Sequence, residues 1–176
     1  ERRIDELVTR FDIPGGIEQA LAAGDDETAS ELYYVSGRIA RERGEAAMEI
    51  EHLSRALELG QNPQLISFCL FFRGLAYYRL GSAEGAAGQA AARFAACADD
   101  LSALLERNPT AEMRSVAYRT RGVALTRLGR SSEAVENYRR LRRQLRRMES
   151  LSRRMIFGDH PNPRRRKRLS QHVLGL

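Results

Sequence analysis

The stretch Ser115–Tyr138, SVAYRTRGVALTRLGRSSEAVENY, decides the fold that this chain is predicted to adopt. It places Gly122 inside one apolar-periodic segment, Gly129 between two such segments, and Ala134 at the start of the second. A glycine within a helix allows a neighbouring helix to approach closely, and a glycine between helices allows a left-handed turn. The stretch therefore predicts two antiparallel helices that are joined by a tight turn.

The same spacing occurs twice earlier in the chain, around Gly37 and Gly74. The matching residues are Tyr33, Gly37, Ala40 and Gly44 in the first segment, and Leu70, Gly74, Tyr77, Gly81 and Ala86 in the second. This set resembles the tetratricopeptide repeat, whose pattern is W-x2-L-G-x2-Y followed by A-x3-F. Arg121 departs from the pattern, because it stands where the family prefers Leu. The resemblance covers about residues 30–145.

The resemblance implies an all-α solenoid of about three antiparallel helix pairs. Residues 1–28 are expected to form short N-terminal helices separated by Ile13-Pro14-Gly15-Gly16, residues 29–157 the repeat domain, and residues 158–176 a basic extended tail. Glu49 falls where the family has a small residue, which predicts a turn one residue longer in the first pair.

Two second helices are expected to be elongated. Gly37 and Gly74 are 37 residues apart, but Gly74 and Gly122 are 48 apart, and we assign the excess to the helix after Gly81. The last helix carries one continuous apolar stripe: Ala134, Tyr138, Leu141, Leu145, Met148, Leu151 and Met155. Because corresponding helices of stacked units lie side by side, we expect the two extensions to pack on each other. The stripe also allows self-association.

In tetratricopeptide proteins the first helix of each unit lines a concave groove that holds a partner peptide or helix. Carried over to this chain, the groove residues are Tyr34, Arg38, Arg41, Phe68, Phe71, Leu75, Tyr78, Arg79, Arg119, Val123, Thr126 and Arg127. Apolar side chains beside guanidinium groups suit a ligand that carries Asp, Glu or a terminal carboxylate. The alternative is that the chain's own termini cover Phe68 and Phe71.

Residues 139–168 are strongly basic, with 13 Arg or Lys side chains against two acidic ones. The candidates for contact with an acidic partner are Arg142, Arg143, Arg146, Arg147, Arg153, Arg154, Arg164, Arg165, Arg166, Lys167 and Arg168. A solvated charged helix, RNA or another polyanion, a nuclear-import signal and a membrane surface are the alternative readings. Aromatic side chains that stack on bases are missing from residues 139–154, which argues against RNA.

We expect no enzyme activity, cofactor or metal site. His52, His160 and His172 are isolated, and no HExxH, P-loop or GxSxG motif occurs. Cys69 and Cys97 lack metal-ligand spacing, and we interpret both as small buried side chains. No run of about 18 apolar residues predicts a membrane span. Since the chain begins with Glu1 rather than Met, we expect a fragment or a processed chain.

The function predicted from the sequence is that of a non-catalytic adaptor or assembly subunit inside the cell, in the cytoplasm or an organelle. It would hold a partner polypeptide in the groove while its arginine-rich end contacts an acidic surface. The alternatives are a structural subunit of a ribonucleoprotein or organellar complex that contacts RNA through the basic tail, and the ligand-sensing tetratricopeptide fragment of a bacterial regulator.

Overall fold

The computed structural model describes residues 12–157. For residues 153, 154, 156 and 157 it describes the backbone but not the side chain. The predicted helix before Asp12 and the predicted basic tail, with Arg164, Arg165, Arg166, Lys167 and Arg168, lie outside the described residues. The described part consists of helices and their connections, without a strand, so the all-α prediction is confirmed. The helices are α2 (Ile13–Ala22), α3 (Asp26–Glu42), α4 (Ala46–Leu59), α5 (Pro63–Ala83), α6 (Ala87–Glu106), α7 (Ala111–Arg127) and α8 (Ser131–Phe157).

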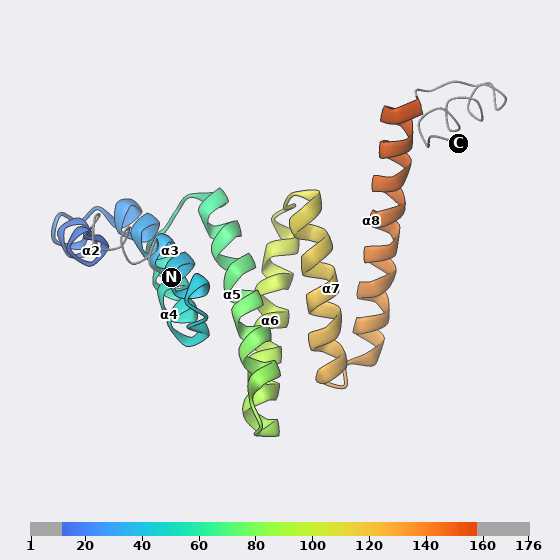
Figure 1. Cartoon of the computed structure of the whole chain (residues 1–176), viewed down its shortest axis with the longest axis horizontal. Coiled ribbons are helices and arrows are strands. Elements are labelled where there is room, and N and C mark those ends of the chain that lie inside the picture. Colours follow the sequence, from blue (N-terminus) through green and yellow to red (C-terminus); the bar gives the residue numbers. More distant parts are fainter. Residues whose placement is uncertain (1–11, 158–176) are drawn as a thin grey trace.

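Each helix packs mainly on the helices that precede and follow it in the chain. Figure 1 shows them side by side in sequence order, from α2 at one end of the molecule to α8 at the other. The closest pairs are α3 with α4, α5 with α6, and α7 with α8, and α5 also contacts α3 and α7. Gly44 and Gly129 have φ angles of 77° and 72° at the turns of the first and third pairs. Both turns leave three residues between their helices, so the longer first turn predicted from Glu49 is wrong.

Three glycines mark the points where paired helices cross most closely. A Cβ atom on Gly37 would lie 2.9 Å from the Leu53 side chain, and one on Gly74 would lie 3.0 Å from the Leu101 side chain. A Cβ atom on Gly122 would lie 2.6 Å from the Tyr138 ring. The close approach predicted for these glycines is confirmed, because only a residue without a side chain leaves room for the partner helix.

Two arginines connect successive helix pairs in the same way. Arg73 of α5 donates to Ser54 Oγ of α4 at 3.0 Å and binds both carboxylate oxygens of Asp100 of α6 at 2.7 and 2.9 Å.

Arg121 of α7 repeats this arrangement one pair later. It donates to Ser102 Oγ of α6 at 2.8 Å and to Asn137 Oδ1 of α8 at 2.9 Å. Asn137 in turn donates to the carbonyl of Tyr118. Arg121, which breaks the sequence pattern, therefore holds three helices together through hydrogen bonds that satisfy a buried amide.

The middle helix pair is longer than the first pair, and both of its helices contribute. α5 is about one turn longer than α3 and α7, and α6 is about two turns longer than α4. Figure 1 shows the common end of α5 and α6 beyond the neighbouring helices. Gly81, expected at the turn, lies inside α5, where a Cβ atom would be 2.9 Å from Arg93 Cβ. The chain turns instead at residues 84–86.

The predicted packing between the two extensions is wrong. The added turns of α6 lie at its N-terminal end, whereas α8 projects at its C-terminal end, on the opposite side of the molecule (Figure 1). The apolar stripe of α8 is consequently exposed at Leu145, Leu151 and Met155, which are 50%, 57% and 82% accessible.

The Ile13-Pro14-Gly15-Gly16 segment also differs from its prediction. It begins α2 rather than separating two helices. Asp12 caps the helix by accepting a hydrogen bond from the Gly15 amide at 3.3 Å, and Pro14 lies in the first turn, where a missing N–H costs little. The start of a helix therefore tolerates residues that would end one.

Candidate functional site

The first predicted groove residues meet where α3 packs on α5. The Tyr34 ring lies 6.3 Å from the rings of both Phe68 and Phe72, and Phe71 contacts Phe72 edge-on at 5.2 Å. All four rings are only partly buried. They form a half-exposed aromatic cluster, defined here as Tyr34, Phe68, Phe71 and Phe72, which joins two neighbouring helix pairs.

Three arginines predicted to meet a ligand are engaged within the protein. The guanidinium carbons of Arg38 and Arg41 lie 4.2 and 5.0 Å from the centroid of the Phe72 ring, as cation–π contacts require. Arg38 also donates to the Tyr34 hydroxyl at 3.4 Å. Arg79 pairs with Glu49, and Arg41 approaches the same carboxylate at 3.6 Å.

Glu49 is the charged centre of this contact between α3, α4 and α5. Its side chain is completely buried. Burial raises the pKa of Glu49 above its ordinary value, although Arg79 and then Arg41 act in the opposite direction. Arg41 and Arg79 therefore compensate a buried acid, and their charge toward an external ligand is reduced.

The remaining predicted groove residues fall into two groups. Phe71 and Tyr78 pack against the core between the second and third pairs, and the Tyr78 ring lies 6.1 Å from that of Phe94. Leu75 and Val123 are half-buried, whereas Arg119, Thr126 and Arg127 are exposed on α7. Arg119 and Arg127 therefore present free guanidinium groups near the C-terminal half of this surface.

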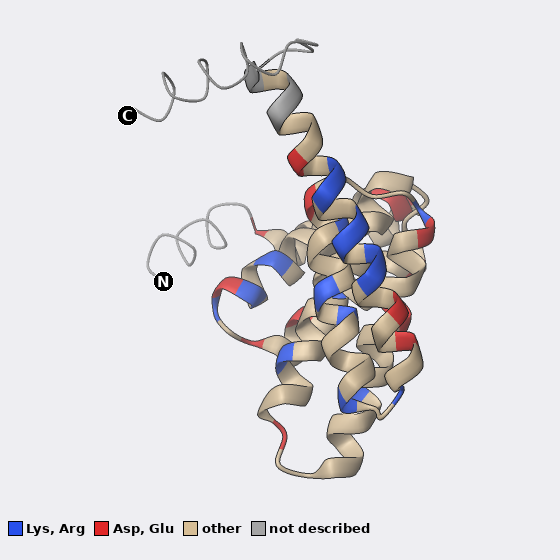
Figure 2. Cartoon of the chain, turned by 90° about the vertical axis from the view of Figure 1, so that its right-hand side faces the viewer, with Lys and Arg blue, Asp and Glu red and all other residues tan. Residues whose placement is uncertain are grey.

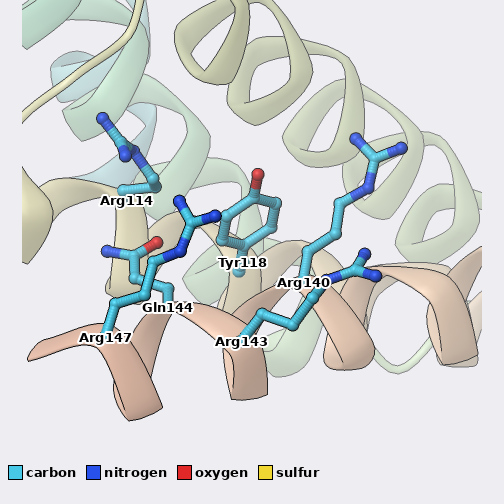
Figure 3. Close-up of a pocket in the computed structure, with 6 residues that line it drawn as sticks. All are labelled: Arg114, Tyr118, Arg140, Arg143, Gln144 and Arg147. Carbon is cyan, nitrogen blue, oxygen red and sulfur yellow. The ribbon is translucent and has the colours of Figure 1, made fainter. Parts of the chain in front are cut away.

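A second site lies between α7 and α8, where four arginines surround a pocket of about 190 Å³. Arg114 and Tyr118 extend from α7, and the other lining residues extend from α8 (Figure 3): Arg140, Arg143, Gln144 and Arg147. In this view the Tyr118 ring stands between Arg147 on one side and Arg140 on the other. We call this the arginine pocket.

Part of the arginine pocket is fixed by hydrogen bonds to the backbone. Arg114 donates to Asn108 Oδ1 at 2.6 Å and to the carbonyl of Pro109 at 2.8 Å. Gln144 donates to the carbonyl of Ala111 at 2.7 Å and to Ser115 Oγ at 3.2 Å. These bonds hold the two ends of the pocket wall in place without neutralising the guanidinium charge.

Within residues 12–157, one carboxylate is bound to the arginines of the pocket. Glu136 accepts hydrogen bonds from Arg140 at 3.2 Å and from Arg143 at 3.0 Å. The bond from Arg140 lowers the pKa of Glu136 below its ordinary value, so this carboxylate stays ionised at neutral pH. Since four cationic side chains line the pocket, a net positive charge remains beside Tyr118.

Arg142 and Arg146, two other predicted arginines of α8, do not line this pocket. Arg142 and Arg146 are exposed, and Figure 2, which looks toward α8, shows basic residues on successive turns of the helix. The side chains of Arg153 and Arg154 lie outside the described residues. Among the predicted basic residues whose side chains the structure describes, it gathers Arg143 and Arg147 into one site.

Sequence reasoning missed five members of the two sites: Phe72, Arg114, Tyr118, Arg140 and Gln144. Phe72 was omitted because the repeat pattern gives its position no groove role, and Arg114 and Tyr118 precede the basic run. Gln144 is an uncharged residue within that run. The sequence signal that could have revealed the α8 wall of the pocket is the spacing of Arg140, Gln144 and Arg147, which places the three residues on one face of a helix.

Across residues 12–157, no helix combines the length and the apolar composition needed to cross a membrane. Within the same residues, His, Cys, Asp and Glu side chains form no group of three or more that could hold a metal ion. The chain matches no protein-family model, no curated protein and no solved structure, so the case for its function rests on its own geometry.

Proposed function

We propose that this chain is a non-catalytic adaptor or assembly subunit built as a divergent tetratricopeptide-like solenoid. The three helix pairs, the glycine at each closest crossing and the equal turns of the first and third pairs support this architecture. The two arginines that connect successive pairs, Arg73 and Arg121, support it further, because the same contact recurs at equivalent places. Stacked units of this kind build elongated surfaces that bind polypeptides.

The partner polypeptide is proposed to lie along α3, α5 and α7. The observation that carries this proposal is the half-exposed aromatic cluster, because aromatic side chains supply much of the binding energy at protein interfaces. Arg38 and Arg41 are already held against Phe72, so ordering their side chains on binding costs little conformational entropy. Arg119 and Arg127 are free to pair with acidic groups of the ligand.

The arginine side of α8 is proposed to contact an acidic surface of the same assembly. It lies at the end of the row of helices, where it is open to a partner (Figure 2). We place this function inside the cell, in the cytoplasm or an organelle.

The experiment that tests the adaptor function compares partner capture by two charge-reversal variants. Arg119→Glu/Arg127→Glu alters two exposed residues of the proposed binding surface, and Arg107→Glu alters an exposed residue at the end of α6. We expect the first variant to lose proteins that wild type and Arg107→Glu retain, as measured by quantitative mass spectrometry after affinity capture.

The thermal midpoint is the control for folding. Because all three arginines are exposed, we expect each variant to melt within about 2 °C of wild type, since surface substitutions change stability by about 0.5 kcal/mol or less. Identical protein sets captured by all the variants would refute the proposed surface.

A ribonucleoprotein subunit is the second candidate function. Arg142 and Arg146 favour it, because they are exposed side chains on successive turns and can pair with phosphates. In that case ribonuclease treatment abolishes capture, and affinity for a uridine oligonucleotide falls steeply with salt.

A further inference from the structure

We propose that the arginine pocket between α7 and α8 binds one phosphate monoester, presented by a phosphorylated serine or threonine of the protein partner. This inference rests on the proposed adaptor function and specifies the acidic group that α8 recognises. It implies that phosphorylation of the partner controls its docking on this end of the molecule.

The charge of the pocket matches a dianion. Four guanidinium groups line it, and Glu136 is paired to two of them. Arg114 is held by neutral acceptors, Asn108 and the carbonyl of Pro109, so its positive charge is not cancelled. A phosphate monoester carries a charge of about −1.5 to −2 at neutral pH, which offsets most of the excess.

The geometry favours a phosphate over a carboxylate. The arginines extend from two helices and lie on both sides of Tyr118, with Arg114 and Arg147 on one side and Arg140 and Arg143 on the other (Figure 3). A phosphate offers three acceptor oxygens in a tetrahedral arrangement, whereas a carboxylate offers two in one plane. More of the guanidinium donors can therefore be satisfied at once by a phosphate.

The size of the pocket favours a single group over a nucleotide or an RNA chain. Its volume of about 190 Å³ is below the range of about 300 Å³ and more that is usual for sites of drug-sized ligands. Single-stranded RNA is bound by successive stacking platforms, but Tyr118 is the one aromatic ring that lines this pocket. Arg142 and Arg146 do not contribute to the wall.

Parts of the wall are ordered before a ligand arrives. Gln144 and Arg114 are fixed to the backbone of the connection before α7 and of its first turn. Such contacts reduce the conformational entropy that binding must remove. Arg140 and Arg143 are also exposed, but both bind Glu136. Arg147 is exposed and is not bound to Glu136, which suits it to close on a ligand.

The experiment titrates O-phosphoserine and aspartate, as their N-acetyl amides, into the full chain and follows the arginine Nε–H signals by NMR. We expect shifts at Arg114, Arg143 and Arg147, with at least tenfold weaker binding of the aspartate probe. Arg147→Gln is expected to weaken phosphoserine binding about tenfold, because a charge-assisted hydrogen bond is lost. Arg146→Gln, one residue away and outside the pocket, is expected to change it less than twofold.

Equal weakening by the two substitutions would overturn the proposal, and so would equal affinity for phosphoserine and aspartate. A uridine dodecamer that binds more tightly than phosphoserine, and that both variants weaken alike, would overturn it in favour of an RNA surface. Since both arginines are exposed, circular dichroism should find both variants folded. If the phosphate proposal fails but Arg119→Glu/Arg127→Glu still loses its partner, the proposed adaptor function stands.

Discussion

Replacing Gly37 by alanine tests the closest crossing between α3 and α4. The added Cβ would lie 2.9 Å from both Cγ and Cδ2 of Leu53, a side chain that is completely buried and cannot swing into solvent. Overpacking of this kind costs about 2–3 kcal/mol, whereas the better helix propensity of alanine returns about 1 kcal/mol. We expect Gly37→Ala to lower the free energy of unfolding by about 1–2 kcal/mol.

Urea denaturation monitored by circular dichroism measures this change. Gly88→Ala is the matched control, because Gly88 lies in α6 and a Cβ there would have no atom within 4 Å. It is expected to be neutral or to stabilise by about 0.5 kcal/mol. Gly122→Ala is also expected to destabilise, since its Cβ would lie 2.6 Å from the Tyr138 ring and 3.0 Å from Nδ2 of the buried Asn137. If Gly37→Ala were as stable as Gly88→Ala, the reasoning about this crossing would be refuted.

Three further predictions concern buried groups. Arg73→Leu leaves the Asp100 carboxylate without its ion pair and should destabilise by about 3 kcal/mol in urea denaturation, whereas Arg73→Leu/Asp100→Leu should recover most of that loss. Burial raises the pKa of the Cys69 and Cys97 thiols to about 12, so both should resist iodoacetamide at pH 8 until urea unfolds the chain. Burial raises the pKa of Glu49 above 4.5, so the free energy of unfolding of wild type relative to Glu49→Gln should decrease as the pH rises above about 4.5. Urea denaturation of both proteins at pH 4 and pH 7 measures this, and the same difference in unfolding free energy at the two pH values would contradict the raised pKa.

The helix pairs were predictable because their signals are local. The spacing of glycines predicted the crossings at Gly37, Gly74 and Gly122. Asn62-Pro63 marks the start of α5, where Asn62 Oδ1 accepts hydrogen bonds from two backbone amides at 3.0 and 3.2 Å. Such signals depend on the chemistry of a few neighbouring residues. They do not depend on what the helix packs against.

The errors arose where one residue type serves two purposes. Gly81 was expected at a turn because glycine is common there, but it lies inside α5, where it permits a close helix contact. The extra length between Gly74 and Gly122 was therefore assigned to the second helix of the pair alone, whereas α5 and α6 share it. Glu49 was interpreted as a mismatch, although it is a buried acid neutralised by residues 8 positions before it and 30 positions after it. Pairing over such distances is decided by the packing of whole helices and leaves no local pattern.

The candidate sites were only partly predictable for the same reason. The basic run identified Arg143 and Arg147, but their pocket depends on Arg114 and Tyr118 from the preceding helix. The charge of Arg38 and Arg41 was evident from the sequence, whereas their placement on Phe72 required knowledge of how α3 meets α5.

The long end of the α5 and α6 pair gives this protein a convenient attachment point for a reporter. Gly85 lies in its loop, and a Cβ there would have no atom within 4 Å, so Gly85→Cys introduces a thiol without disturbing a neighbour. Because Cys69 and Cys97 are both buried, a maleimide dye would react with the new thiol first among the cysteines of this chain. A fluorophore at this end, away from α8, would report partner binding by its anisotropy while leaving the arginine pocket unlabelled.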